Sequence, residues 1–165
     1  MFGCGPVGMF AILSAQLQGA GRVLAVDQAT SRLQQARRLG AEVIDFSRED
    51  PVQTLRHLTG GTGPDRIIDA VGIDAESPGD DRDPGSRQEV DEIAPDRPAD
   101  DSPIRPPGDA PSQALRWEVD ALAKAGTLSI VGVYAPADEH FPIGMAMNKE
   151  PDHQDRQLQP PQVRS

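Results

Sequence analysis

The chain contains few of the residues that bind metal ions or form disulfide bonds. Its 165 residues include one cysteine, Cys4, and three histidines, His57, His140 and His153. A structural zinc site commonly uses four cysteine or histidine ligands, and a catalytic one uses three protein ligands. The three histidines fall in a helix-like stretch, a loop and a polar tail, without the spacing of a ligand set. We therefore expect no metal site, and the single cysteine, which excludes an internal disulfide, suggests the reducing cytoplasm.

Aromatic residues and long apolar runs are also scarce. Aromatic side chains make up 4% of the sequence, and no apolar run reaches the roughly 20 residues of a membrane-spanning helix. The apolar opening stretch, residues 1–15, lacks the basic start of an export signal, so we do not expect one. The formal net charge of −10 at pH 7 disfavours binding to nucleic acid. We expect neither a membrane nor a nucleic-acid partner.

Most of the negative charge is concentrated in one stretch. Residues 73–112 hold eight of the sixteen prolines, twelve acidic and four basic side chains, and no aromatic residue. Such a segment cannot bury enough apolar area to offset the entropy lost on ordering, so we predict a disordered insertion. Residues 148–165 are similarly polar and are predicted to form a disordered tail. Residues 1–72 and 113–147 are left to form the folded domain.

The most specific local motif is a glycine-rich loop. Residues 3–8 have the spacing G-x-G-x-x-G, and a strand-like run ends in Asp27 nineteen residues later. Gly3 permits a sharp turn, Gly5 lets the backbone approach a pyrophosphate, and Gly8 allows a helix to pack close to the sheet. A carboxylate at Asp27 accepts hydrogen bonds from a ribose and repels a 2′-phosphate. The motif therefore predicts a dinucleotide site that prefers NAD to NADP. For the loop taken alone, a glycine-rich turn without a ligand is the alternative.

The two folded segments alternate between helix-like and strand-like patterns. Apolar spacing, capping residues and glycine stops predict helices from Pro6 to about Gly19, from Thr30 or Ser31 to Gly40, from Asp50 to Gly60, and over residues 115–123. Apolar, β-forming runs predict strands over residues 22–27, 43–46, 66–71 and 127–134. Alternating strands and helices with continuous apolar strands indicate a parallel sheet that is covered on both faces.

We therefore predict an α/β fold, a Rossmann-type doubly wound parallel sheet with a long disordered insertion. Only Met1 and Phe2 precede the loop and a polar run follows Lys149, so we expect this fold to be truncated at both ends. We expect Asp50 to be the N-cap of its helix, and Thr30 or Ser31 to cap the preceding one. The inward face of the first helix is expected to be the stripe Val7, Phe10, Ala11, Ser14 and Leu17.

The motifs taken together resemble the coenzyme domain of the zinc-containing medium-chain alcohol dehydrogenases. The segments that carry the resemblance, in order, are residues 3–8, 23–27 with Arg32, 39–41, 63–65, 69–72 and 125–134. The insertion after Gly72, followed by residues 141–144 and 147–149, is similar to the formaldehyde dehydrogenase-like branch. The resemblance covers residues 1–149 apart from the interior of the insertion.

This resemblance implies NAD as the cofactor and a set of residues around it. The implied contacts are Gly3, Cys4, Gly5, Pro6, Val7, Gly8, Asp27, Arg32, Ala70, Val71, Val131, Gly132 and Val133. Arg32 would lie along the adenosine, with a helix-surface charge as the alternative. Cys4 would pack or line the pyrophosphate site, with a redox or ligand role as the less favoured alternative. Trp117 is interpreted as a packing residue.

In the resembled family a separate catalytic domain carries the zinc ligands, and this chain has no counterpart of it. The implied function is the NAD-binding portion of a zinc-dependent alcohol or formaldehyde dehydrogenase. We expect no catalytic residue or metal ligand in this chain and no activity when it is isolated. A small alcohol or aldehyde would be a partner only if a catalytic domain were supplied, and family members are often homo-oligomers. The alternatives are a non-catalytic dinucleotide-binding module and, less well supported, an S-adenosylmethionine-dependent methyltransferase.

Overall fold

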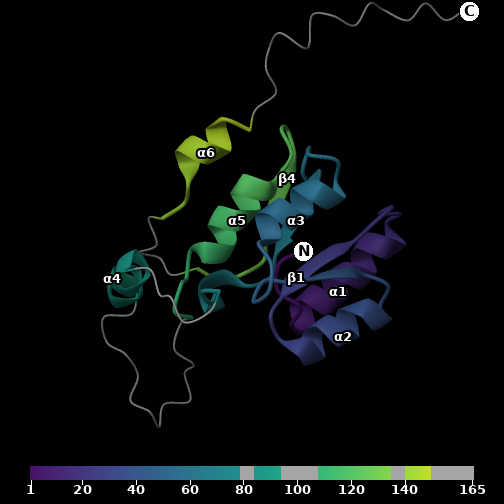
Figure 1. The fold of residues 1–165 in the computed structure, drawn as a ribbon, viewed down its shortest axis with the longest axis horizontal. Coiled ribbons are helices and arrows are strands. Elements are labelled where there is room, and N and C mark those ends of the chain that lie inside the picture. The colour runs from purple at the N-terminus through teal and green to yellow at the C-terminus, as the bar shows by residue number, and fades with distance from the viewer. Residues whose placement is uncertain (79–83, 94–107, 135–139, 150–165) are drawn as a thin grey trace, which may run out of the picture.

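The computed structural model describes residues 1–78, 84–93, 108–134 and 140–149 (Figure 1). The predicted tail from residue 150 onward lies outside the described residues, as do residues 79–83 and 94–107 of the predicted insertion. Short parallel strands alternate with helices along the described chain.

Four parallel strands form the sheet, and the backbone at Phe2 joins its two halves. The strands are β1 (Leu24–Asp27), β2 (Glu42–Asp45), β3 (Arg66–Asp69) and β4 (Thr127–Ile130). β1 pairs with β2, and β3 pairs with β4. Phe2 forms parallel bridges to both Val26 of β1 and Asp69 of β3. The spatial order is therefore β2, β1, the chain at Phe2, β3 and β4, which is a doubly wound order. The predicted Rossmann-type fold is confirmed.

Backbone hydrogen bonds on both sides of Phe2 hold this junction. The Phe2 N–H donates to the carbonyl of Ile68 at 3.0 Å, and the Phe2 carbonyl accepts from Ala70 N–H at 2.9 Å. On the other side, Gly3 N–H donates to the carbonyl of Val26 at 2.9 Å. The Phe2 ring is buried in the hydrophobic core that also contains Val26 and Ile67. The glycine loop therefore leaves the middle of the sheet, at the point between β1 and β3.

Helices cover both faces of the sheet. Their bounds are α1 (Pro6–Leu17), α2 (Thr30–Arg38), α3 (Pro51–Leu58), the 3₁₀ turn η1 (Gly72–Asp74), α4 (Pro84–Ile93), α5 (Gln113–Ala121) and α6 (Ile143–Met147). Figure 1 shows α1 and α2 on one side of the strands and α3 and α5 on the other. The α1/α2 side has a core of small and aliphatic side chains, Cys4, Ile12, Ala25, Ala36 and Ala41. The α3/α5 side has the larger core, which includes Phe2, Val26, Ile44, Leu55 and Ile67.

One of the two predicted helix caps is confirmed. The Asp50 carboxylate accepts from the N–H groups of Val52 and Gln53 at 2.8 and 3.0 Å, which caps α3. The prediction of Thr30 or Ser31 for α2 is wrong, because Ala29 occupies the N-cap position without a side-chain cap.

The prediction for the inward face of α1 is also wrong. Val7, Phe10 and Leu17 are 52%, 73% and 88% exposed, whereas Gly8 and Ile12 are buried. α1 carries apolar side chains on both faces, so apolar spacing alone does not identify the buried one. The contact of Gly8 with the glycine loop decides the orientation, since a Cβ at Gly8 would overlap the carbonyl oxygen of Gly3.

Two helical elements extend into residues 73–112, for which the composition predicts disorder. η1 begins at Gly72, and α4 lies further along. Ser86, Glu89 and Val90 are buried on α4, and the Glu89 carboxylate lies 3.7 Å from the Arg116 guanidinium on α5. These buried positions are three and four residues apart, so they lie on one face of the helix. The overall composition of the stretch does not reveal this face.

A buried carboxylic acid, Glu118, lies on α5. Its side chain is fully buried, and among the described residues neither carboxylate oxygen has a hydrogen-bond partner. Burial raises the pKa of Glu118 to about 9, with a further contribution from the charge of Asp69 and an opposing one from the amino group of Met1. At neutral pH the folded state therefore holds a proton here that the unfolded chain releases.

Replacing Glu118 should stabilise the fold increasingly as the pH rises. Between pH 4.5 and about 9 the native state binds the additional proton, so Glu118 lowers the unfolding free energy as pH increases. Glu118→Met, which removes a buried unpaired polar group, should gain about 1–3 kcal/mol at pH 8 and less at pH 5. Urea unfolding of both proteins at the two pH values measures this difference. A gain that is larger at pH 5 than at pH 8 would contradict the assignment.

Candidate functional site

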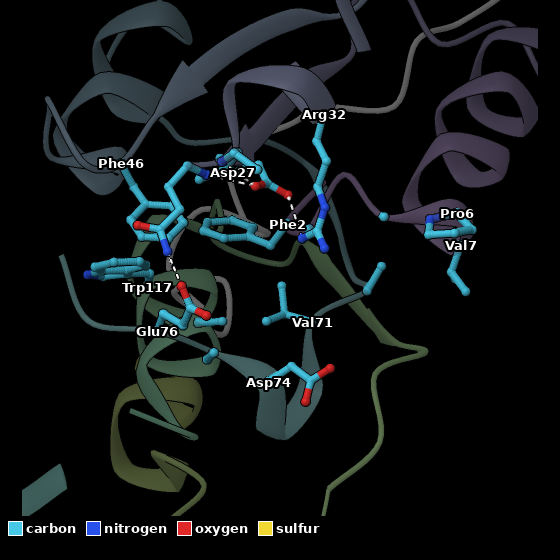
Figure 2. A pocket seen from close by; sticks show the side chains of 18 of the residues that line it. Phe2, Pro6, Val7, Asp27, Arg32, Phe46, Val71, Asp74, Glu76 and Trp117 are labelled. Atoms are coloured by element: carbon cyan, nitrogen blue, oxygen red, sulfur yellow. Dashed lines mark hydrogen bonds and ion pairs between the residues drawn. The ribbon is translucent and has the colours of Figure 1, made fainter. Parts of the chain in front are cut away.

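A cavity of about 560 Å³ opens at the carboxyl ends of β1 and β3, where the chain at Phe2 separates the two halves of the sheet (Figure 2). In open α/β sheets, ligands bind where the strand order reverses in this way. The lining side chains come from the glycine loop, the β1–α2 turn, the end of β2, the segment after β3, and α5. The cavity is the candidate functional site.

Two glycines of the loop, Gly3 and Gly8, have no room for a side chain. Gly3 has a φ of +82°, and a Cβ there would lie 2.8 Å from the carbonyl oxygen of Ala70. Gly8 is packed against the same loop, as described above. Gly5 differs, because a Cβ there would meet no atom within 4 Å. Gly5 lines the cavity just before Pro6, the first residue of α1.

Asp27 fastens the glycine loop to the turn that follows β1. Its carboxylate is 5% exposed and accepts three backbone hydrogen bonds of 2.8 Å, from the N–H groups of Cys4, Gln28 and Ala29. The guanidinium of Arg32, which is half-exposed, lies 3.7 Å from the same carboxylate. Together these groups occupy about four lone-pair positions of the carboxylate. Asp27 thus has a structural role that the sequence motif does not reveal.

Cys4 is buried beneath the loop. Its side chain is 1% exposed and packs in the core on the α1/α2 side. Burial raises the pKa of the Cys4 thiol to about 12, and the neighbouring Asp27 adds to the effect. The thiolate is the reactive form of cysteine, so this side chain is chemically inert in the folded state.

A second buried carboxylate, Asp69, shapes the opposite wall. It is fully buried at the end of β3 and accepts from the N–H groups of Val71 and Gly72 at 2.7 and 3.2 Å. Its other oxygen accepts from the Tyr134 hydroxyl at 2.7 Å. Asp69 therefore fixes the position of Ala70 and Val71, which line the cavity.

Two aromatic rings stand at one end of the cavity. Phe46 directly follows β2, and Trp117 lies on α5. Their ring centroids are 5.4 Å apart with the planes inclined by 55°. Figure 2 shows this pair on one side of Asp27 and Arg32, with Pro6 and Val7 on the other. Gln28 and Glu76 also line the cavity, and the side-chain amide of Gln28 donates a hydrogen bond to the Glu76 carboxylate.

The structure brings part of the predicted residue set together. The predicted residues that line the cavity are Gly3, Gly5, Pro6, Val7, Asp27, Arg32, Ala70 and Val71. Cys4 and Gly8 belong to the loop but are not among the lining residues. Val131, Gly132 and Val133 lie beyond β4, where the Val133 carbonyl accepts from Ile73 N–H at 2.9 Å, and they are also not among the lining residues.

Sequence reasoning missed the lining roles of Phe46 and Trp117. The signal for Phe46 was available, because it follows a predicted strand and so falls at the carboxyl edge of the sheet. Trp117 had no such signal, since its helix follows a long segment of unknown course.

Comparison with known proteins identifies this region. A sequence profile of the family described as zinc-binding dehydrogenase matches residues 6–77. A relative named as an uncharacterised zinc-type alcohol dehydrogenase-like protein AdhB, from Bacillus subtilis strain 168, is 36% identical over 151 residues. These residues are 90% of this chain and 35% of that relative. Residues 6–77 are therefore similar in sequence to a region of the zinc-type alcohol dehydrogenases.

Further relatives agree with this assignment. An L-threonine 3-dehydrogenase of Bacillus velezensis is 40% identical over 73 residues, which are 44% of this chain and 21% of that relative. Among solved structures, the alcohol dehydrogenase TADH from Thermus sp. ATN1 superposes with a TM-score of 0.63 at 28% identity, covering 90% of this chain and 32% of that one. The chain therefore spans about a third or less of the length of these relatives.

The described residues contain no group of three or more His, Cys, Asp and Glu side chains arranged to hold a metal ion. The helices of the same residues include none that is long and apolar enough to cross a membrane.

Gly5 and Gly8, which differ in the space around them, provide a matched test of the loop. Gly8→Ala should lower the unfolding free energy by at least about 1–3 kcal/mol, because the added methyl overlaps backbone that cannot move freely. Gly5→Ala should cost less than about 1 kcal/mol, since it meets open space and changes only an N-cap residue. Chemical denaturation of the two variants compares them directly. An equal loss in both would show that the packing of Gly8 does not hold the loop.

Cys4 should react with a thiol reagent only after unfolding. At pH 8 the native chain should show little modification over the time in which the urea-unfolded chain is fully modified, because the thiol is buried and protonated. Colorimetric thiol titration with a disulfide reagent measures both rates. Equal rates in the folded and unfolded chains would refute the burial of Cys4.

Proposed function

We propose that the cavity binds NAD as part of a zinc-type alcohol dehydrogenase. The observation that carries the proposal is the position of Asp27, which lies in one cavity with the glycine loop and is bonded to it through Cys4 N–H. A dinucleotide needs such an arrangement, because its pyrophosphate and its adenosine ribose are covalently joined and must be bound at the same time by neighbouring groups.

The glycine-loop end of the cavity suits the pyrophosphate. In the described part of the chain no side chain caps α1, and Pro6 occupies its first turn. The remaining N–H groups of that turn and the positive end of the helix dipole favour an anion. Gly5 leaves the space into which the phosphates would fit.

The size and polarity of the cavity also fit this ligand. Its volume of about 560 Å³ is within the roughly 300–1,000 Å³ of small-molecule sites. Asp27 would accept from one ribose hydroxyl at the position that Arg32 vacates when it moves aside, and Ala70 and Val71 would contact the adenosine. Bound NAD supplies a hydride acceptor, and the residues of this chain bind and orient it.

The charges around the cavity favour NAD over NADP. Asp27, Asp74 and Glu76 line the cavity, and Arg32 is the only basic residue among the lining side chains. Arg32 already lies against Asp27. A 2′-phosphate would therefore be placed against an excess of negative charge.

We infer that the residues of this sequence do not supply the zinc half of the reaction. One cysteine and three histidines are present, and the described residues do not gather them into a ligand set. We infer that the chain binds the coenzyme and does not turn over an alcohol or aldehyde by itself. A small alcohol or aldehyde becomes a substrate only when a catalytic domain is supplied, and a non-catalytic coenzyme-binding module is the alternative.

The finer assignment to the formaldehyde dehydrogenase-like branch is also a proposal. It is supported by residues 141–144 and 147–149, which follow the pattern of that branch. In the structure these residues form the two ends of α6 and the positions next to it. The single cysteine supports a reducing, cytoplasmic location.

Titration with the two coenzymes tests the function. Wild-type protein should bind NAD at least about tenfold more tightly than NADP, and this ratio should fall towards one in Asp27→Asn. Asp27→Asn keeps the shape of the side chain but replaces one of the two accepting oxygens with a donating NH2 group, so a thermal melt of this variant accompanies the titration. Asp74→Asn is the control, because it removes a charge from the same cavity without touching the loop. Isothermal calorimetry gives the dissociation constants of the three proteins for both coenzymes, and equal or tighter NADP binding by the wild type would contradict the proposal.

A further inference from the structure

A second cavity, of about 250 Å³, is lined by residues of α5, β4 and the segment around α6. α6 packs against α5 (Figure 1), and none of the described lining residues also lines the cavity at the glycine loop. The larger apolar side chains in the lining are Val119, Leu122, Leu128 and Phe141. Phe141 is 41% exposed, so a ligand in the second cavity would cover apolar surface that now faces water.

Lys149 is the only described lining residue of the second cavity that has a polar side chain. Its ammonium group donates to the carbonyl of Asp120 at 2.6 Å, and its own backbone carbonyl accepts from Ala125 N–H at 2.6 Å. Both ends of the residue are therefore tied to the end of α5 and the turn that follows it. A ligand that binds this ammonium group loses less rotamer freedom than it would with a mobile lysine.

Positive charge exceeds negative charge around this ammonium group. The Asp120 carboxylate accepts from the Arg56 guanidinium at 2.7 Å, so Arg56, Asp120 and Lys149 together carry two positive charges and one negative. Burial lowers the pKa of the Lys149 amino group, with a further contribution from Arg56 and an opposing one from Asp120. An ammonium group has three N–H donors, and one of them is bonded to the Asp120 carbonyl. The charge and the remaining donors favour an anion at this position.

The backbone that holds Lys149 is in an unfavourable conformation. Ala125, which also lines the second cavity, has a φ of +59°, and no other non-glycine residue in the described part of the chain has a positive φ. A residue with a Cβ disfavours this left-handed region and persists in it only where its surroundings hold it there. The bond to the Lys149 carbonyl is such a contact. Strain of this kind is concentrated at ligand sites, which supports a binding role for the turn.

We propose that the second cavity binds a small monocarboxylate with an apolar body, an aromatic or short alkyl carboxylate, and that Lys149 binds its carboxylate group. The volume of about 250 Å³ is just below the roughly 300–1,000 Å³ of sites for drug-sized molecules, which favours a ligand with few atoms. One ammonium group matches one negative charge. The apolar walls disfavour an inorganic anion, which would lose hydration without gaining partners there. The inference goes beyond the proposed function and does not depend on it.

Isotope labelling of lysine tests the inference in the full chain, because the sequence has only two lysines, Lys124 and Lys149. Labelling with ¹³C at Cε gives one NMR signal for each. Benzoate should move the Lys149 signal with saturation and leave unchanged the signal of Lys124, which is exposed and not among the lining residues. Acetate has the charge without the ring, and benzamide has the ring without the charge. Each should bind at least about tenfold more weakly than benzoate.

Variants separate the charge from the apolar wall. Lys149→Met keeps an apolar stem and removes the charge, so it should raise the benzoate dissociation constant about tenfold. Phe141→Ala removes part of the wall and should also weaken benzoate binding, by several-fold. Lys124→Met is the matched control, because it removes the other lysine charge, and it should leave the constant unchanged. Saturation-transfer NMR measures benzoate binding to these variants, and thermal melts show how much of any effect is due to lost stability.

Three results would overturn the inference. One is that benzoate moves both lysine signals alike, and another is that acetate binds as tightly as benzoate, because either shows binding to surface charge alone. The third is that the Lys149 signal moves with protein concentration in the absence of benzoate, which shows that a second copy of the chain covers the cavity. If Lys149→Met does not fold, the wild-type titration with the three probes decides the matter. These readouts are separate from NAD binding, so the proposed function can fail while this inference holds, and the reverse.

Discussion

The backbone pairing at Phe2 is the interaction on which the rest of the structure depends. Its N–H and carbonyl both bond to β3, while the adjoining Gly3 N–H bonds to β1. Without this junction the strands would form two separate pairs, since β1 pairs with β2 and β3 pairs with β4. The same junction sets the starting point of the glycine loop and so the position of the cavity.

Two buried carboxylates fix the walls of the cavity through the same kind of hydrogen bond. Asp27 at the end of β1 and Asp69 at the end of β3 each accept hydrogen bonds from backbone N–H groups of the segment that follows. Such charge-assisted bonds are stronger than neutral ones and are well shielded here. Asp27 additionally accepts from Cys4 N–H, so the two walls and the loop are fixed before a ligand arrives.

The features that could be predicted from sequence are the local ones. The glycine loop, Asp27 and the Asp50 cap depend on residues close together in the chain, and strand–helix alternation was sufficient for the fold class. The orientation of α1 was not predictable in this way, because both of its faces are apolar and a backbone contact of Gly8 decides between them. Trp117 could not be assigned to the cavity either, since its position depends on how α5 packs across the sheet. The ion pair that joins α4 to α5 is likewise not recorded in the composition.

On α1, the residues that face the solvent are different from the residues that attach the helix to the sheet. Phe10 and Leu17 are largely exposed, while the attachment of the helix to the sheet depends on Gly8 and Ile12 on the other side. Isolated surface substitutions of this kind usually change stability by less than about 0.5 kcal/mol. Solubility can therefore be engineered here by placing charged side chains at these outward positions, with the cavity and the core left as they are.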